Sequence, residues 1–257
     1  MTVMSGKVSY FFAEAVAVVA AVVCLCACDR SHGAVGFVVD NAASVTTMYF
    51  DVAENDGKAE AGRFLGSVMV RTDDAGHEVY REVRCADGGL SEWHEVYYDA
   101  DGRQDSVAVH SVRYGADRMS VIEYDADGDG TEREYSQEGE LLRTTMRRNG
   151  RRSEILTTYP DGVSSMVRST MRKGRIVRET CEWNDGRGKS VTEYEYDGDG
   201  KLLTAKTSNG VVGSCETYDY IAVDSCGNWI CRVKYVTVDD SPADAVTMEK
   251  RLIEYRH

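Results

Sequence analysis

One short acidic stretch has the residue types of a calcium loop. The segment Asp125-Ala-Asp-Gly-Asp-Gly130 places three carboxylates at alternate positions, with glycines that permit a sharp turn. Carboxylate oxygens in this arrangement suit a hard cation such as Ca²⁺. Position twelve, a glutamate in an EF-hand loop, is Ser136 here, which argues against an EF-hand. A similar stretch, Tyr98-Asp-Ala-Asp-Gly102, favours the alternative that both are ordinary acidic turns. The candidate calcium ligands are Asp125, Asp127 and Asp129.

Aromatic residues form a second candidate site. They recur along the chain at strand-like spacing, and exposed rings of this kind could bind a glycan or a peptide. The alternative, which we favour, is that they form the packing ladder of the sheet itself. The candidate binding residues are Tyr98, Tyr124, Tyr159, Trp183 and Tyr196.

Signatures of catalysis are missing from the sequence. None of the five histidines falls in a metalloprotease or hydrolase motif, and no Gly-x-Ser-x-Gly elbow or phosphate-binding loop occurs. We therefore expect a protein that is not an enzyme and needs no cofactor other than the candidate Ca²⁺. A carboxylate-based hydrolase is the alternative, because two carboxylates from distant turns could meet in the fold.

The charge balance limits the partners. The 257 residues include 43 acidic and 30 basic side chains, for a formal net charge of −13. Nucleic acids attract a basic surface, so the composition argues against a nucleic-acid partner.

The N-terminal residues have the layout of an export signal. Lys7 precedes an apolar run from Ala15 to Leu25, which is too short for a stable transmembrane helix. The following Leu25-Cys-Ala-Cys28 resembles the lipobox of bacterial lipoproteins, which implies that Cys28 is acylated. This resemblance predicts a signal peptide at 1–27, a tether at 28–44, and lipid anchoring to the outer membrane of a cell envelope. The alternative is an ordinary secretory peptide without lipid.

Glycines punctuate the rest of the chain at intervals of 11 to 14 residues. Many follow Asp or Asn, a pairing that favours two-residue hairpin turns with both central residues in left-handed geometry. Between the turns, segments such as 106–114 and 190–196 are rich in β-branched and aromatic residues. The recurring glycines are Gly76, Gly88, Gly102, Gly115, Gly128, Gly139, Gly150, Gly162, Gly174, Gly186, Gly198 and Gly210.

These patterns predict an all-β fold over residues 45–257. Short strands joined by tight turns make an antiparallel meander of hairpin repeats. Because both faces of the strands are partly polar, we expect a long twisted single-layer or solenoid-like sheet rather than a thick core.

Several segments resemble the tyrosine–aspartate (YD, or Rhs-type) repeat. They include Tyr124-Asp-Ala-Asp-Gly128, 194–204 and the ending Asp224-Ser-Cys-Gly-Asn-Trp-Ile-Cys-Arg232. The resemblance implies an envelope lipoprotein of the Bacteroidetes type, with an all-β repeat domain. The expected function is to present a repetitive sheet surface to a glycan or protein partner. A toxin accessory or immunity protein of the Rhs type is an alternative.

Overall fold

The structure is a computed structural model that describes residues 39–56, 58–113, 115–148, 152–239, 241 and 244–256. The predicted signal at 1–27 and its lipidation residue Cys28 lie outside the described residues. Within the described ranges, no helix has the length and hydrophobicity needed to cross a membrane.

Antiparallel strands make up most of the described chain, in agreement with the all-β prediction. They run β1 (Ala42–Asn55), β2 (Lys58–Thr72), β3 (Glu78–Arg84), β4 (Leu90–Tyr98), β5 (Gln104–Ser111), β6 (Ala116–Tyr124), β7 (Gly130–Ser136), β8 (Leu141–Arg148), β9 (Arg152–Thr158), β10 (Ser164–Arg172), β11 (Arg175–Trp183), β12 (Lys189–Tyr196), β13 (Leu202–Ser208), β14 (Gly213–Val223), β15 (Trp229–Val238) and β16 (Asp244–Tyr255).

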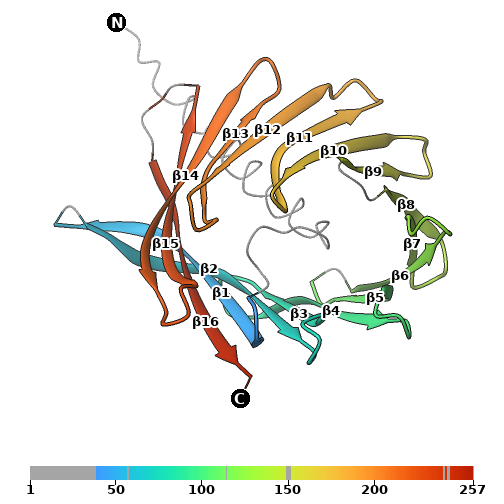
Figure 1. Cartoon of the computed structure of the whole chain (residues 1–257), viewed down its shortest axis with the longest axis horizontal. Coiled ribbons are helices and arrows are strands. Elements are labelled where there is room, and N and C mark those ends of the chain that lie inside the picture. Colours follow the sequence, from blue (N-terminus) through green and yellow to red (C-terminus); the bar gives the residue numbers. More distant parts are fainter. Residues whose placement is uncertain are drawn as a thin grey trace, which may run out of the picture. The chain divides into compact units, whose positions relative to one another are not determined.

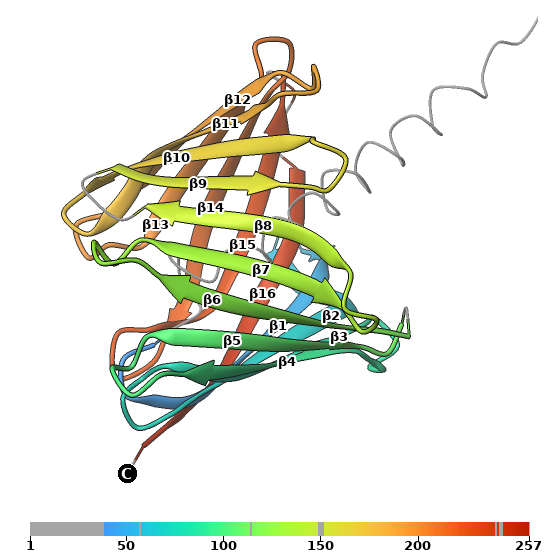
Figure 2. The same ribbon diagram turned by 90° about the vertical axis from the view of Figure 1, so that its right-hand side faces the viewer.

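The sheet closes into a barrel. Each strand pairs with the next along the chain, and β1 pairs with β16, so that the ring is complete (Figure 1). At this seam Val45 lies opposite Ile253 and Thr47 opposite Arg251. Figure 2 shows the hairpins side by side in the sheet that forms the wall of the barrel.

Closure corrects the expected sheet shape. The meander of hairpins is present, but the prediction of an open twisted sheet or a solenoid is wrong, because the first and last strands pair with each other. An open sheet would leave two rows of unpaired backbone groups, whereas a closed sheet leaves none. Each strand twists relative to its neighbour, and the accumulated rotation brings the two ends of the meander together.

Several turns differ in type from the prediction, whereas the β10–β11 turn matches it, because Lys173 and Gly174 both have positive φ between the paired Arg172 and Arg175. In the β6–β7 turn the amide of Asp125 donates to the carbonyl of Asp129 at 3.0 Å, and the amide of Gly128 donates to the carbonyl of Asp125 at 3.1 Å. Gly128 has a φ of +82°, whereas Asp127 is not in the left-handed region. This is a three-residue loop with a glycine bulge rather than the expected two-residue turn. In the β12–β13 turn Gly200, not Gly198, takes the left-handed conformation.

The two faces of the sheet differ in burial. Along β7, Glu132 and Glu134 are 8% and 4% exposed, while the intervening Arg133 side chain is 40% exposed. Successive residues of a strand point to opposite faces, and the concave face of a barrel crowds its side chains together. We therefore name the face of Glu132 and Glu134 the inner face and that of Arg133 the outer face. Among the described residues, more polar than apolar side chains are buried.

The apolar core is correspondingly small. Its buried cluster consists of Val39, Ala42 and Val45 beside the seam, with Ile253 and Tyr255 packed against it. The wall is thus held together mainly by the hydrogen bonds of the strand ladder and by polar side-chain contacts.

Candidate functional site

One of the three predicted calcium ligands, Asp125, is engaged by its own turn. Asp125 Oδ1 accepts hydrogen bonds from the backbone amides of Asp127 (3.0 Å) and Asp129 (2.9 Å). Asp99 binds its turn in the same way. No group of three or more Asp, Glu, His or Cys side chains suited to a metal ion occurs in the described ranges. The calcium site stays a prediction.

Three of the five predicted binding residues tie neighbouring strands together. Each stands at the end of its strand, and its hydroxyl donates to a backbone carbonyl at the start of the strand before. These hydrogen bonds run from Tyr98 to Glu78 (2.8 Å), from Tyr124 to Gln104 (2.9 Å) and from Tyr196 to Ile176 (2.8 Å). A phenol group that is used in this way stabilises the wall and is not free for a ligand.

The other two predicted residues meet at one rim. Tyr159 and Trp183 line a shallow depression of about 510 Å³ between the β9–β10 and β11–β12 turns, together with Asp161 and Arg187. The Arg187 guanidinium lies 3.5 Å from the centre of the Trp183 ring. It also donates to Asp185 at 2.6 Å, so this surface offers an aromatic ring that a cation already covers.

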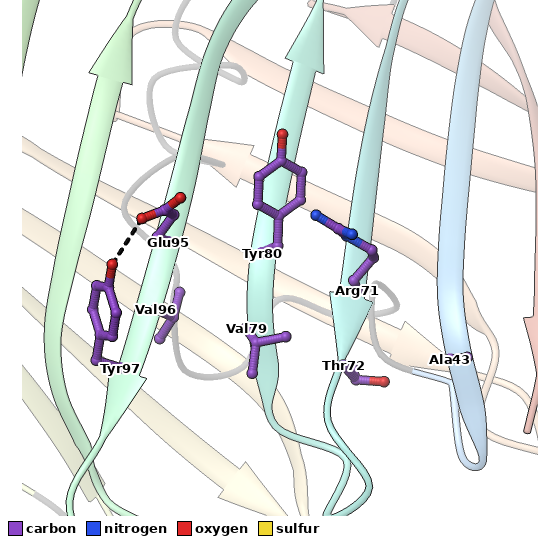
Figure 3. Close-up of a pocket in the computed structure, with 8 residues that line it drawn as sticks. All are labelled: Ala43, Arg71, Thr72, Val79, Tyr80, Glu95, Val96 and Tyr97. Carbon is purple, nitrogen blue, oxygen red and sulfur yellow. Dashed lines mark hydrogen bonds between the residues drawn. The ribbon is translucent and has the colours of Figure 1, made fainter.

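A second shallow depression, of about 620 Å³, lies over β2–β4. In Figure 3, Arg71, Tyr80, Glu95 and Tyr97 stand in front of the ribbon, with the opposite wall behind them, so this depression is on the outer face. Arg71 lies 4.1 Å from the centre of the Tyr80 ring, and the Tyr97 hydroxyl donates to Glu95 at 2.7 Å. These side chains thus contact one another in two pairs.

The inner face of β6–β8 contains a network of ion pairs. Arg147 donates to Glu132 at 2.7 Å, and Arg118 donates to Glu134 at 3.0 Å. Arg143 also bonds to Glu134. Burial tends to raise the pKa of Glu132, but the charge and hydrogen bond of Arg147 outweigh it and hold that pKa below its ordinary value. The Glu132 carboxylate is therefore kept ionised and paired.

A second inner-face cluster spans β14–β16. Arg232 donates to Glu249 at 2.8 Å and lies 4.2 Å from the centre of the Trp229 ring. Arg251 lies 3.6 Å from the centre of the same ring, so two guanidiniums lie against Trp229. The neighbouring Glu216 accepts the Tyr218 hydroxyl at 2.6 Å and pairs with Lys234 at 3.6 Å. We name Glu216, Tyr218, Trp229, Arg232, Lys234, Glu249 and Arg251 the arginine–tryptophan cluster.

The pKa values of the two arginines in this cluster are shifted in opposite directions. Burial alone would lower the pKa of Arg232, but Glu249 and the phenol oxygens nearby raise it above its ordinary value. Burial and the positive charge of Arg232 lower the pKa of Arg251 to about 9. Glu249 thus compensates the charge of Arg232, whereas its influence on Arg251 is outweighed by burial and by Arg232.

The sequence analysis missed this cluster. Its residues come from three strands, and the charges alternate with other charges, as in Glu249-Lys250-Arg251, instead of alternating with apolar residues. A signal was present, because the strand-like segments have polar residues on both faces. That pattern cannot indicate which face becomes concave.

Comparisons with known proteins identify no family. No protein-family model matches the chain, and no curated protein does. Among solved structures, a porin-like protein from Bacteroides uniformis ATCC 8492 is similar, with 10% sequence identity and a TM-score of 0.39. The match covers 84% of this chain and 99% of that one. A likeness of this size says nothing about what the chain binds.

These results correct the family assignment. The resemblance to YD-repeat, Rhs-like lipoproteins is wrong: no family model supports it, and the repeats build a closed barrel instead of an open repeat sheet. The repeated Tyr and Asp-x-x-Gly residues have a local explanation instead, as strand ties and three-residue turns. The toxin-accessory alternative depended on that resemblance and has no other support.

Proposed function

We propose that the chain is an exported β-barrel protein of the cell envelope. Its outer face is in contact with water instead of lipid, and it acts by binding rather than by catalysis. The main support is the charge on both faces of the wall. Glu132-Arg133-Glu134 lies in the centre of β7, and Glu249-Lys250-Arg251 lies within β16. Because consecutive residues alternate between faces, each strand presents charge inward and outward.

A wall of this kind does not suit lipid. A basic residue on the lipid face at the bilayer midplane costs about 2–4 kcal/mol. The outer face contains Arg168, which pairs with Glu154 at 3.0 Å and Glu182 at 3.2 Å. Such cross-strand pairs are typical of a surface in contact with water.

The location at the envelope is supported by the export-type N-terminal sequence. Its apolar run and the Cys28 that follows lie outside the described residues, and attachment through Cys28 stays a prediction. A barrel that is surrounded by water next to a membrane is compatible with a lipid on Cys28 and also with its absence.

Binding is favoured over acid–base catalysis by the state of the carboxyl groups. Among the described residues, each carboxyl group with a shifted pKa has it lowered. A general acid acting near neutral pH needs a raised pKa. The lowered groups are Asp73, Asp99, Glu132, Glu182, Asp185, Glu195 and Asp224.

The proposal is tested by thiol labelling of the outer face. Met119 is in the middle of β6 on the outer face and is 48% exposed. In the full chain mixed with lipid vesicles, Met119→Cys should react with a water-soluble, membrane-impermeant maleimide at a rate comparable to that of Cys226. Cys226 is exposed at a rim and serves as the internal control. Labelled peptides are identified by mass spectrometry.

The opposite result is equally clear. If vesicles protect position 119 while Cys226 still reacts, and the vesicles become permeable to ions, the barrel spans the bilayer and the proposal is overturned.

A further inference from the structure

Two buried polar groups of the inner face lie next to each other without a hydrogen-bond partner. Thr47 is 1% exposed, and its hydroxyl oxygen makes no hydrogen bond; the Nε of Arg251 is buried and makes none either. Thr47 and Arg251 are opposite each other across the β1–β16 seam. Directly opposite residues have Cβ atoms about 4.5–5.5 Å apart. Unsatisfied donors of this kind are rare in the interior of a protein and call for an explanation.

The charge of the arginine–tryptophan cluster is also incomplete. Arg232 uses Glu249, and Lys234 together with the Tyr218 hydroxyl uses Glu216. Three cationic side chains thus share two carboxylates. Arg251 has contact with the Trp229 ring but no ion pair with any described residue. A half-buried cation without a counter-charge destabilises the fold unless something else supplies that charge.

We propose that the arginine–tryptophan cluster and Thr47 form an oxyanion-binding site on the inner face. The guanidinium edge of Arg251 would hold two oxygens of a carboxylate or phosphate group, which matches its fork of donors. The Thr47 hydroxyl would donate a further hydrogen bond.

This inference deepens the proposed binding role, because it names a ligand class and a place. The competing explanation is that Arg251 serves only to stack on Trp229, a contact that stabilises a protein with no ligand present. The two explanations differ in what removal of the Arg251 charge does to ligand response.

The test uses the full chain, with inorganic phosphate and sodium acetate as separate probes and sodium chloride at equal ionic strength as reference. We expect phosphate, acetate or both to raise the melting temperature and to change tryptophan fluorescence saturably. Arg251→Gln should weaken this response about tenfold or more. The same variant in chloride alone should melt at the wild-type temperature or above it, because an uncompensated charge has been removed.

Three further variants make the result decisive. Arg178→Gln, on the outer face with 54% of its side chain exposed, should leave the response unchanged. Trp229→Phe should keep the thermal response but lose the fluorescence change. Arg251→Lys keeps the positive charge but lacks the two-donor edge of the guanidinium, so it should respond weakly to the probes. This variant tests the site if Arg251→Gln does not fold.

The outcome is independent of the location of the barrel. A wild-type chain that responds to neither probe, or an Arg251→Gln variant that responds as well as the wild type, overturns the site. Failure of the labelling experiment would instead overturn the aqueous location, so the two failures are distinguishable.

Discussion

At the scale of single residues, the most buried ion pairs of the inner face are expected to contribute most to the free energy of unfolding. Glu132→Gln leaves the Arg147 guanidinium with no counter-charge, and removing one partner of a buried pair costs about 3–5 kcal/mol. We expect a loss of this size in the free energy of unfolding at pH 7. The native pKa of Glu132 is below the ordinary 4.5, so its contribution is complete above about that pH and disappears as the pH falls through the native value. Denaturant unfolding from pH 7 to pH 3 should therefore show the two proteins converging in acid.

Glu193 provides the matched control on the outer face. Its side chain is 60% exposed, and it lies 3.7 Å from Arg178. Pairs in water contribute about 0–1 kcal/mol, so Glu193→Gln should have little effect at any pH. Equal effects of the two substitutions would show that burial does not govern these pairs.

At the scale of the elements, the backbone conformation of a turn glycine is expected to affect stability more than the space around it does. Gly128 has a φ of +82°, and a Cβ added there would meet nothing within 4 Å. Gly128→Ala should thus cost about 1–2 kcal/mol through backbone strain alone. Gly198 also has open space, but its φ is outside the left-handed region. Gly198→Ala should be neutral or stabilising by about 0.4–1 kcal/mol. Thermal unfolding of both variants measures the difference, and the reverse order would mean that the turn is placed wrongly.

The hairpins could be predicted from the sequence because they depend on residues close together in the chain. In Asp197-Gly-Asp-Gly200 the dipeptide rule chose the first glycine, whereas the structure uses the second. The reason is that Asp197 accepts a hydrogen bond from the amide of Lys201, four residues on, which requires a three-residue loop. Turn class therefore depends on the spacing from the aspartate as well as on the residue that precedes the glycine.

The candidate sites could be predicted only in part, for a geometric reason. Tyr159 and Trp183 were singled out by type, and the structure brings them to the same rim. The arginine–tryptophan cluster needs three strands in register and knowledge of which face is concave. Neither is a local property of the sequence, so Arg251 and Thr47 had no distinguishing mark before the barrel was known.

At the scale of the whole molecule, closure is the feature that sequence patterns could not supply. The Ser44 hydroxyl donates to Glu254 at 2.7 Å across 210 residues of chain. Arg256 likewise donates to the carbonyl of Thr72 at 2.9 Å, from the end of β16 to the end of β2. Every other strand pairing joins neighbours along the chain, so an open meander would keep all of the pairings except the one at the seam.

The seam therefore offers the sharpest test of the fold. Thr46 and Leu252 are opposite each other across β1 and β16 on the outer face, and Leu252 is 58% exposed. A short bifunctional thiol reagent should link Thr46→Cys to Leu252→Cys within one chain, because directly opposite Cβ atoms are about 4.5–5.5 Å apart. The linked chain is recognised by its faster migration in a denaturing gel and by the cross-linked peptide in mass spectrometry. In the control, Thr46→Cys combined with Ile221→Cys, two strands separate β1 from β14, and no link should form. An open sheet would give no link in either pair, which would contradict the closed barrel.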